Sequence, residues 1–200
     1  MRAGHCFHGP YGILKLVTSG RGHMKIAIFV GSLRRDSVNK KLARNLELAV
    51  PDDVNVVYVD IQQPLFNADN EQEMPQSVQQ MKAIVEEADG VLFVTPEYNR
   101  SMPGVLKNAI DWVSRPDNSF RDKPAGITGA TYGSLGTLAA QISLFPVLHH
   151  LGMRVMTRPE LYFNFAGDKL DSGGKVVDDY HEQLQGYMDA FIRHIHHCKH

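Results

Sequence analysis

From residue 25 onward, short apolar runs alternate with longer segments in which apolar residues recur every three or four positions. The short runs are typical of strands, and the longer spacing is typical of helices. The runs at 26–30 and 91–94 contain only apolar residues, as expected for strands that are covered on both faces of a parallel sheet. Five such strand–helix units in succession predict a doubly wound α/β fold.

We expect strands at 25–30, 55–59, 91–95, 125–130 and 154–157. The helices are expected at about 38–49, 78–88, 103–113, 138–150 and 176–195. Pro103 suits the first turn of its helix, whereas Pro146 is expected to distort the helix that contains it. Gly152 is expected to end that helix.

Three loops that follow strands carry unusual residues, at 31–39, 96–102 and 131–137. Ligands of doubly wound sheets bind beyond the carboxyl ends of the strands, where the strand order reverses. A five-stranded parallel sheet of order 2-1-3-4-5 brings these three loops side by side. We therefore expect them to form one site.

The loop at 31–39 has the residue types of a phosphate site. Gly31 allows a tight turn, and the side chains that follow supply hydroxyl, amide and guanidinium donors. These donors belong to Ser32, Arg34, Arg35, Ser37 and Asn39. The N-terminus of the next helix adds free N–H groups and partial positive charge. An ordinary polar turn between a strand and a helix explains this loop by itself about equally well.

The other two loops suit a flat ring. Residues 96–101 offer backbone amides and one aromatic side chain, and residues 131–137 are small where a ring must approach the backbone. Neither the Gly-x-Gly-x-x-Gly pattern of dinucleotide sites nor the Gly-Lys-Ser/Thr ending of a triphosphate loop follows the first strand. A planar cofactor with one phosphate, such as flavin mononucleotide (FMN), fits all three loops.

Composition limits the function classes without selecting one. The chain has 200 residues and a formal net charge of −1, which suits one domain and gives no bulk electrostatic reason to bind nucleic acid or membrane. Its two cysteines, Cys6 and Cys198, form no disulfide framework, so a reducing cytoplasm is expected. Residues 1–23 lack periodicity and are interpreted as a leader or an added segment outside the fold, which leaves 24–200 as the domain.

Two motifs resemble those of the NADPH-dependent FMN reductase family, and most closely its bacterial quinone and chromate reductases. They are Gly-Ser-Leu-Arg-Arg-Asp-Ser-Val-Asn at 31–39 and Pro-Glu-Tyr-Asn-Arg-Ser-Met-Pro-Gly-Val-Leu-Lys-Asn-Ala-Ile-Asp-Trp at 96–112. The resemblance implies a flavodoxin-like fold, FMN as cofactor and NADPH or NADH as co-substrate. It also implies a homodimer or homotetramer.

The resemblance further implies a role for each matching residue. The FMN phosphate would be bound by Ser32, the Leu33 amide, Arg34, Ser37 and Asn39. The ribityl chain and the ring would contact Pro96, Glu97, Tyr98, Asn99, Ser101, Thr131, Gly133 and Ser134. Arg100 would guide substrates, although a solvated or subunit-bridging arginine is an equal alternative. Thr137 stands where the family pattern has a second glycine.

The expected activity is reduction of quinones, chromate, azo compounds or free flavin by ping-pong hydride transfer. The chemistry belongs to the flavin, so no side chain is predicted to be catalytic. Glu97 is interpreted as a carboxylate that accepts hydrogen bonds, and Trp112 as helix packing or an interface anchor. His194 and Cys198 could share an ion, but a solvated C-terminal segment is favoured and no metal is predicted. A flavodoxin-type electron carrier and a redox-inactive phosphate-binding module are the alternatives.

Overall fold

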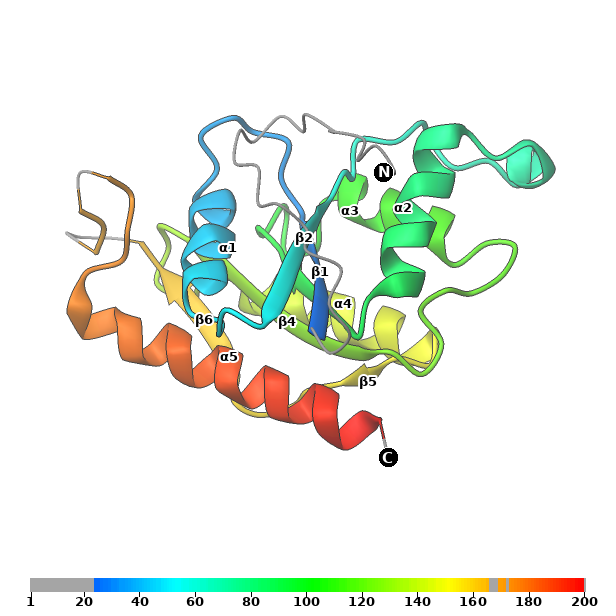
Figure 1. The fold of residues 1–200 in the computed structure, drawn as a ribbon. Helices are drawn as coiled ribbons and strands as arrows, with labels where there is room; N and C mark the ends of the chain where they lie inside the picture. The colour runs from blue at the N-terminus through cyan, green and yellow to red at the C-terminus, as the bar shows by residue number, and fades with distance from the viewer. Residues whose placement is uncertain (1–23, 166–168, 172, 200) are drawn as a thin grey trace, which may run out of the picture.

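The computed structural model describes residues 24–165, 169–171 and 173–199, so the predicted leader at 1–23 lies outside the described residues. Five parallel strands lie in the order β2-β1-β3-β4-β5, which confirms the predicted sheet (Figure 1). Their bounds are β1 (Met24–Val30), β2 (Val54–Val59), β3 (Gly90–Val94), β4 (Pro124–Thr131) and β5 (Arg154–Val155).

We expected one strand at 154–157 beside β4, but two short strands occupy that place in the sheet. Here β5 has two residues and pairs with β4 at Pro124 and Ala125. A further strand that the sequence did not predict, β6 (Leu161–Asn164), pairs in parallel with Thr128–Thr131 of the same strand. The chain between them contains Pro159, which has no N–H for the sheet ladder. One edge position is therefore divided between two short segments.

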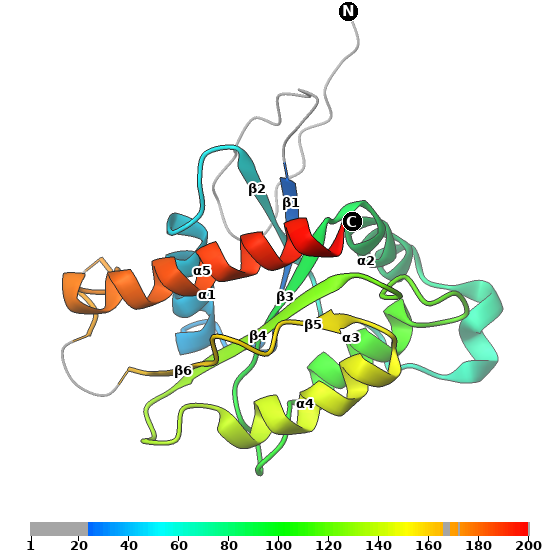
Figure 2. The ribbon, with the colours of Figure 1, turned by 90° about the horizontal axis from the view of Figure 1, so that it is seen from below.

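Helices cover both faces of the sheet. On one face lie α1 (Val38–Leu48) and α5 (Asp178–Cys198), and on the other lie α2 (Gln76–Glu87), α3 (Gly104–Val113) and α4 (Leu138–His150). Figure 2 separates α1 and α5 from α3 and α4 across the strands. A short 3₁₀ helix, η1 (Ala68–Glu73), lies in the loop after β2 and was not predicted.

Alternate residues of β1 explain why its apolar run has no polar position. Ile26 and Ile28 pack with α1 and α5, whereas Ala27 and Phe29 pack with α2, α3 and α4. All four are fully buried. A strand with a core on each face has no solvent side that could carry polar residues.

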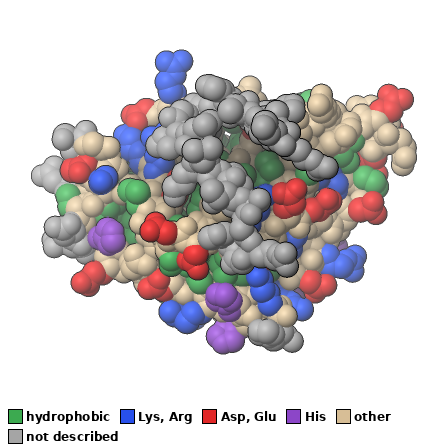
Figure 3. Space-filling model, in the orientation of Figure 1, with side chains coloured by type: hydrophobic (Ala, Val, Ile, Leu, Met, Phe, Trp, Pro, Cys, Tyr) green, Lys and Arg blue, Asp and Glu red, His purple; other side chains and the backbone are tan. Residues whose placement is uncertain are grey.

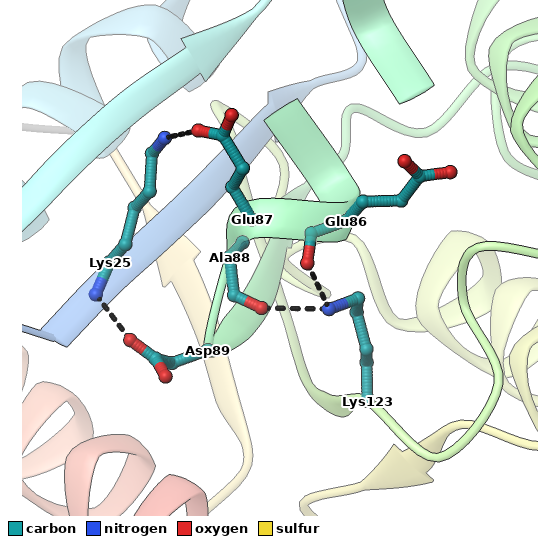
Figure 4. Close-up of polar contacts among 6 residues, drawn as sticks. All are labelled: Lys25, Glu86, Glu87, Ala88, Asp89 and Lys123. Atoms are coloured by element: carbon teal, nitrogen blue, oxygen red, sulfur yellow. Dashed lines mark hydrogen bonds and ion pairs between the residues drawn. The ribbon is translucent and has the colours of Figure 1, made fainter. Parts of the chain in front are cut away.

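Polar contacts join the elements at the amino-terminal ends of the strands, opposite to the three loops (Figure 4). The Asp89 carboxylate accepts the Lys25 backbone N–H at 2.7 Å and pairs with Lys199 Nζ at 2.7 Å. Lys123 Nζ donates to the carbonyls of Glu86 (3.0 Å) and Ala88 (2.8 Å), at the end of α2. Burial lowers the pKa of Lys123, against the opposing charges of Asp89 and Glu86.

The end of α5 is docked, which differs from the solvated segment that we expected. Arg154 Nη1 donates to the Cys198 carbonyl at 3.0 Å, and His194 Nε2 lies 2.7 Å from the Arg154 carbonyl. His194 and Cys198 are half-buried, with 3.8 Å between Nε2 and Sγ. Within the described ranges, no three His, Cys, Asp or Glu side chains form a group that could hold a metal ion. In the same ranges, no helix has the length and apolar character needed to cross a bilayer.

Candidate functional site

Free backbone amides dominate the loop between β1 and α1. Gly31 N–H donates to the Val94 carbonyl at 2.9 Å, and Ser32 N–H donates to Val30 at 2.7 Å. Within the described part of the chain, the N–H groups of the five residues 33–37 donate to no other protein group. Consecutive free amides at a helix N-terminus are a ready binding site for an anion.

The charges around this loop also favour an anion. The first turn of α1 contains no acidic residue, and Arg34 and Arg35 are exposed just before it. A hydrogen bond and the charge of Lys41 hold the pKa of Asp36 below its ordinary value, with a smaller effect from Arg34. On the face shown in Figure 3, Lys and Arg side chains lie at the upper left, over the start of α1.

Ser37 and Asn39 have structural partners as well. Ser37 Oγ accepts the Asn39 N–H at 3.2 Å, which caps α1 and leaves the hydroxyl hydrogen free. The Asn39 side chain donates to the Ala130 carbonyl at 2.9 Å and accepts the Ala130 N–H at 2.8 Å. Asn39 therefore joins the first loop to the end of β4, and one Nδ2 hydrogen is left for a ligand.

The second loop, after β3, is a tight hairpin turn. Tyr98 and Ser101 exchange backbone hydrogen bonds of 2.9 and 3.0 Å. Between them, Asn99 and Arg100 have positive φ angles of 51° and 63°, as in a type I′ turn. The N–H groups of Glu97, Asn99 and Arg100 donate to no protein group among the described residues. Three donors are therefore available to the polar edge of a ring.

Glu97 caps α4 instead of facing an open site. Its Oε2 accepts the N–H groups of Ala139 at 3.0 Å and Ala140 at 3.3 Å, in the first turn of that helix. Its Oε1 lies 3.7 Å from Arg100 Nη1. This agrees with the interpretation that Glu97 accepts hydrogen bonds, and it identifies the donors. Glu97 therefore joins the second loop to the start of α4.

Ser143, in α4, holds the second loop at another point, and the sequence did not single it out. Its Oγ accepts the Met102 N–H at 3.1 Å and lies 3.2 Å from Ser101 Oγ. The same hydroxyl oxygen lies 2.8 Å from the Ala140 carbonyl. The second loop is therefore fastened to α4 by both Glu97 and Ser143.

The third loop, after β4, is fixed at both ends and exposed in the middle. Thr131 Oγ1 accepts the Gly133 N–H at 3.2 Å, and Tyr132, Gly133, Ser134 and Leu135 are exposed. A Cβ on Gly133 would meet nothing closer than 3.8 Å, so this side of the loop is open. The loop thus presents small and aromatic residues above the sheet.

Two glycines near this loop are needed for packing. Gly136 has a φ of 62°, and a Cβ there would lie 2.6 Å from the Tyr162 Cβ. A Cβ on Gly129 would lie 2.1 Å from the Thr95 carbonyl oxygen. Thr137, which replaces the expected second glycine, is fully buried and accepts from Gln141 at 3.1 Å.

Asn108 and Trp112 hold the loop that follows β2. Asn108 Oδ1 accepts the Phe66 N–H at 2.8 Å, and Trp112 Nε1 donates to the Pro64 carbonyl at 2.8 Å. The Trp112 ring also meets Phe66 edge-on at 5.1 Å. Trp112 is therefore a packing residue of α3, one of the two roles expected for it.

The residues present fit a flat ring with one phosphate. At the start of α1 lie the Ser37 hydroxyl, two arginines and five amides that have no protein acceptor among the described residues. The neighbouring loops offer free N–H groups and an open glycine. Because β1, β3 and β4 are adjacent and parallel, the loops that follow them lie together at the carboxyl ends of the strands. The direct ligand contacts assigned to individual residues stay predictions.

Comparisons with known proteins agree with this chemistry. The family model described as NADPH-dependent FMN reductase matches residues 24–168. A 2-hydroxy-1,4-benzoquinone reductase from Burkholderia sp is 44% identical over 172 residues, covering 84% of this chain and 94% of the relative. A quinone reductase from Escherichia coli strain K12 is 38% identical over 175 residues, covering 84% and 93%.

Solved structures show the same arrangement. The flavoenzyme NAD(P)H:(acceptor) oxidoreductase FerB from Paracoccus denitrificans superimposes with a TM-score of 0.83 and 39% identity, covering 87% of this chain and 98% of that one. A flavodoxin from the domain Archaea shares the fold, with a TM-score of 0.54 and 16% identity, covering 88% of this chain and 100% of that one.

Proposed function

Because the chain belongs to the NADPH-dependent FMN reductase family, we propose that it reduces quinones with electrons from NADPH or NADH. Family membership makes it an NAD(P)H-dependent flavoenzyme with FMN as its cofactor. When held by the three loops, FMN would supply two-electron redox chemistry, through which a hydride from the nicotinamide could be passed on to the acceptor in a ping-pong cycle. Chromate, azo compounds and free flavin are further proposed acceptors.

The row of free amides at residues 33–37 carries this proposal. These amides, the side chains of Ser32, Arg34 and Ser37, and the remaining Asn39 hydrogen hold the phosphate. The free N–H groups of Glu97, Asn99 and Arg100 bind the polar edge of the ring. Pro96, Tyr98, Ser101, Thr131, Gly133 and Ser134 line the ring and the ribityl chain. Arg100 contacts the incoming substrate.

A homodimer or homotetramer that buries the outer face of α4 is part of the proposal. Residues 124–148 contain no charged side chain, although Ile142 and Phe145 are 62% and 41% exposed. A helix that is apolar on both faces is normally buried, and the cores of interfaces are depleted of charge. A second copy is the occupant that the family resemblance favours. The proposed location is the cytoplasm.

The visible spectrum of the FMN-reconstituted and desalted protein, before and after anaerobic NADPH, tests the function. Retained flavin absorption that bleaches on addition is expected. Retained flavin that stays oxidised with both NADPH and NADH would favour an electron carrier. No retained flavin would refute the assignment of all three loops.

A further inference from the structure

The exposed apolar side chains gather at the proposed ring site. Among the described residues, eight large hydrophobic side chains are exposed, and four of them lie on the three loops. These are Leu33, Tyr98, Tyr132 and Leu135. Two more, Ile142 and Phe145, lie on α4. Exposed apolar side chains concentrated in one place mark an interaction site.

Tyr132 and Leu135 are displayed by a loop that is anchored on both sides of them. The Gly133 N–H bonds to Thr131 Oγ1 directly beside Tyr132. After Leu135, Gly136 packs against Tyr162, and the Leu138 N–H donates to the Leu135 carbonyl at 3.3 Å. Between these two anchors, Tyr132 is 60% exposed and Leu135 is 55% exposed.

The surroundings favour an uncharged ligand. Residues 124–148, which include the whole third loop, carry no charge. On the second loop, Arg100 is partly neutralised by Glu97 at 3.7 Å, and Tyr98 beside it is 52% exposed. On the second and third loops an oxyanion would lose hydration and meet only Arg100, which is paired with Glu97, whereas a flat apolar ring would gain aromatic contacts.

We propose that Tyr132 and Leu135, together with Tyr98, form a wall that contacts the electron acceptor and selects flat aromatic acceptors over oxyanions. The inference rests on the proposed function and names the acceptor class that its site prefers. In the reaction, a quinone takes up two electrons and two protons and leaves as the hydroquinone. The electrons come from the NADPH that was oxidised in the preceding half-reaction.

Three variants and one control test the wall. Tyr132→Ala and Leu135→Ala each remove one apolar side chain from the wall, and Tyr132→Phe keeps the aromatic ring without its hydroxyl. Leu48→Ala is the control, because Leu48 is 59% exposed in the last turn of α1, away from the three loops. Equilibrium dialysis of 1,4-naphthoquinone against the oxidised, FMN-loaded protein gives a dissociation constant without turnover. Steady-state kinetics then compare naphthoquinone with chromate.

We expect Tyr132→Ala to weaken naphthoquinone binding roughly 3- to 10-fold, the range of one aromatic contact. kcat/KM for naphthoquinone should fall by the same factor, while kcat/KM for chromate stays within twofold of the unchanged protein. Leu135→Ala should act in the same direction, and Tyr132→Phe and Leu48→Ala should match the unchanged protein.

If Tyr132→Ala binds naphthoquinone as tightly as the unchanged protein does, Tyr132 does not contact the acceptor and the proposal is refuted. Equal losses for naphthoquinone and chromate would overturn the selectivity. A lower molar mass of Tyr132→Ala in light scattering would instead place Tyr132 in a subunit interface, which also refutes acceptor contact. If the unchanged protein retains no FMN or does not oxidise NADPH, the proposed function itself is refuted. That result is distinguishable from the outcomes for the variants.

Discussion

At the scale of single residues, the polar groups of the site have two different roles. Arg34 is exposed, and among the described residues the amides at 33–37 have no protein acceptor, so both are available to a ligand. Asn39 and Glu97 use most of their hydrogen-bonding capacity to join elements that are 91 and 42 residues apart in the chain. A variant at either kind of position could lower FMN binding, so stability and affinity must be measured separately.

Arg34→Ala should weaken FMN binding about tenfold, which corresponds to roughly 1.4 kcal/mol. The guanidinium is exposed beside the proposed phosphate site and contributes charge and donors there. Flavin fluorescence titration measures the change. Arg44→Ala, an exposed arginine further along α1, is the matched control and should bind FMN normally. Unchanged affinity in Arg34→Ala would remove Arg34 from the phosphate site.

Glu97→Ala should lower the free energy of unfolding of the FMN-free protein by about 1 kcal/mol, the usual effect of losing a helix N-cap. Two N–H groups at the start of α4 lose their acceptor. Glu97→Gln keeps one acceptor oxygen and should lose less. Urea denaturation at pH 7 measures both variants. A Glu97→Ala protein as stable as the unchanged one would show that the cap contributes nothing.

At the scale of elements, long-range polar contacts decide how the last helix sits. α5 could end in solvent by its sequence pattern, yet Asp89, Arg154 and Lys199 fasten its final turn to the sheet edge. Burial alone would raise the pKa of Asp89, but hydrogen bonds from Lys199 and the Lys25 amide lower it overall. The carboxylate is therefore more stable ionised in the folded protein than in the unfolded chain.

This shift makes the contribution of Asp89 depend on pH. A pKa below the ordinary 3.8 in the folded state means that the stabilisation is complete above that value and is lost as pH falls through the lowered pKa. Asp89→Asn should cost about 1 kcal/mol at pH 7, and its stability should converge with that of the unchanged protein in more acid solution. Chemical denaturation across pH measures this. The exposed Asp52→Asn variant is the control, and a pH-independent difference would contradict the argument.

At the scale of the whole molecule, the sheet, the three loops and α4 form one unit. The second loop is fastened to α4 by Glu97 and Ser143, and α4 carries an uncharged outer face. A second copy seated on that face would therefore touch the helix that supports the ring-binding loop. Oligomer formation and the shape of the site are expected to depend on each other.

Ile142→Asp should convert the proposed oligomer to a monomer, because a charge in the apolar core of an interface loses its hydration without a partner. Light scattering after size-exclusion chromatography measures the mass. Leu48→Asp changes a side chain of similar exposure, 59% against 62%, on the opposite face of the sheet, and should leave the mass unchanged. An unchanged mass for Ile142→Asp would move the interface away from α4.

The sequence by itself determined the succession of the strands β1–β5 and their helices, and the three loops between them, because hydrophobic periodicity reports local structure and burial. The strand order of the sheet was expected for a flavodoxin-like fold, and the structure confirms it. The tertiary structure alone decided the division of the edge strand into β5 and β6, the pairing of Asn39 with Ala130, the cap that Glu97 places on α4 and the docking of α5. Each of these depends on which distant group meets a polar side chain, and a pattern along the chain contains no information about that partner.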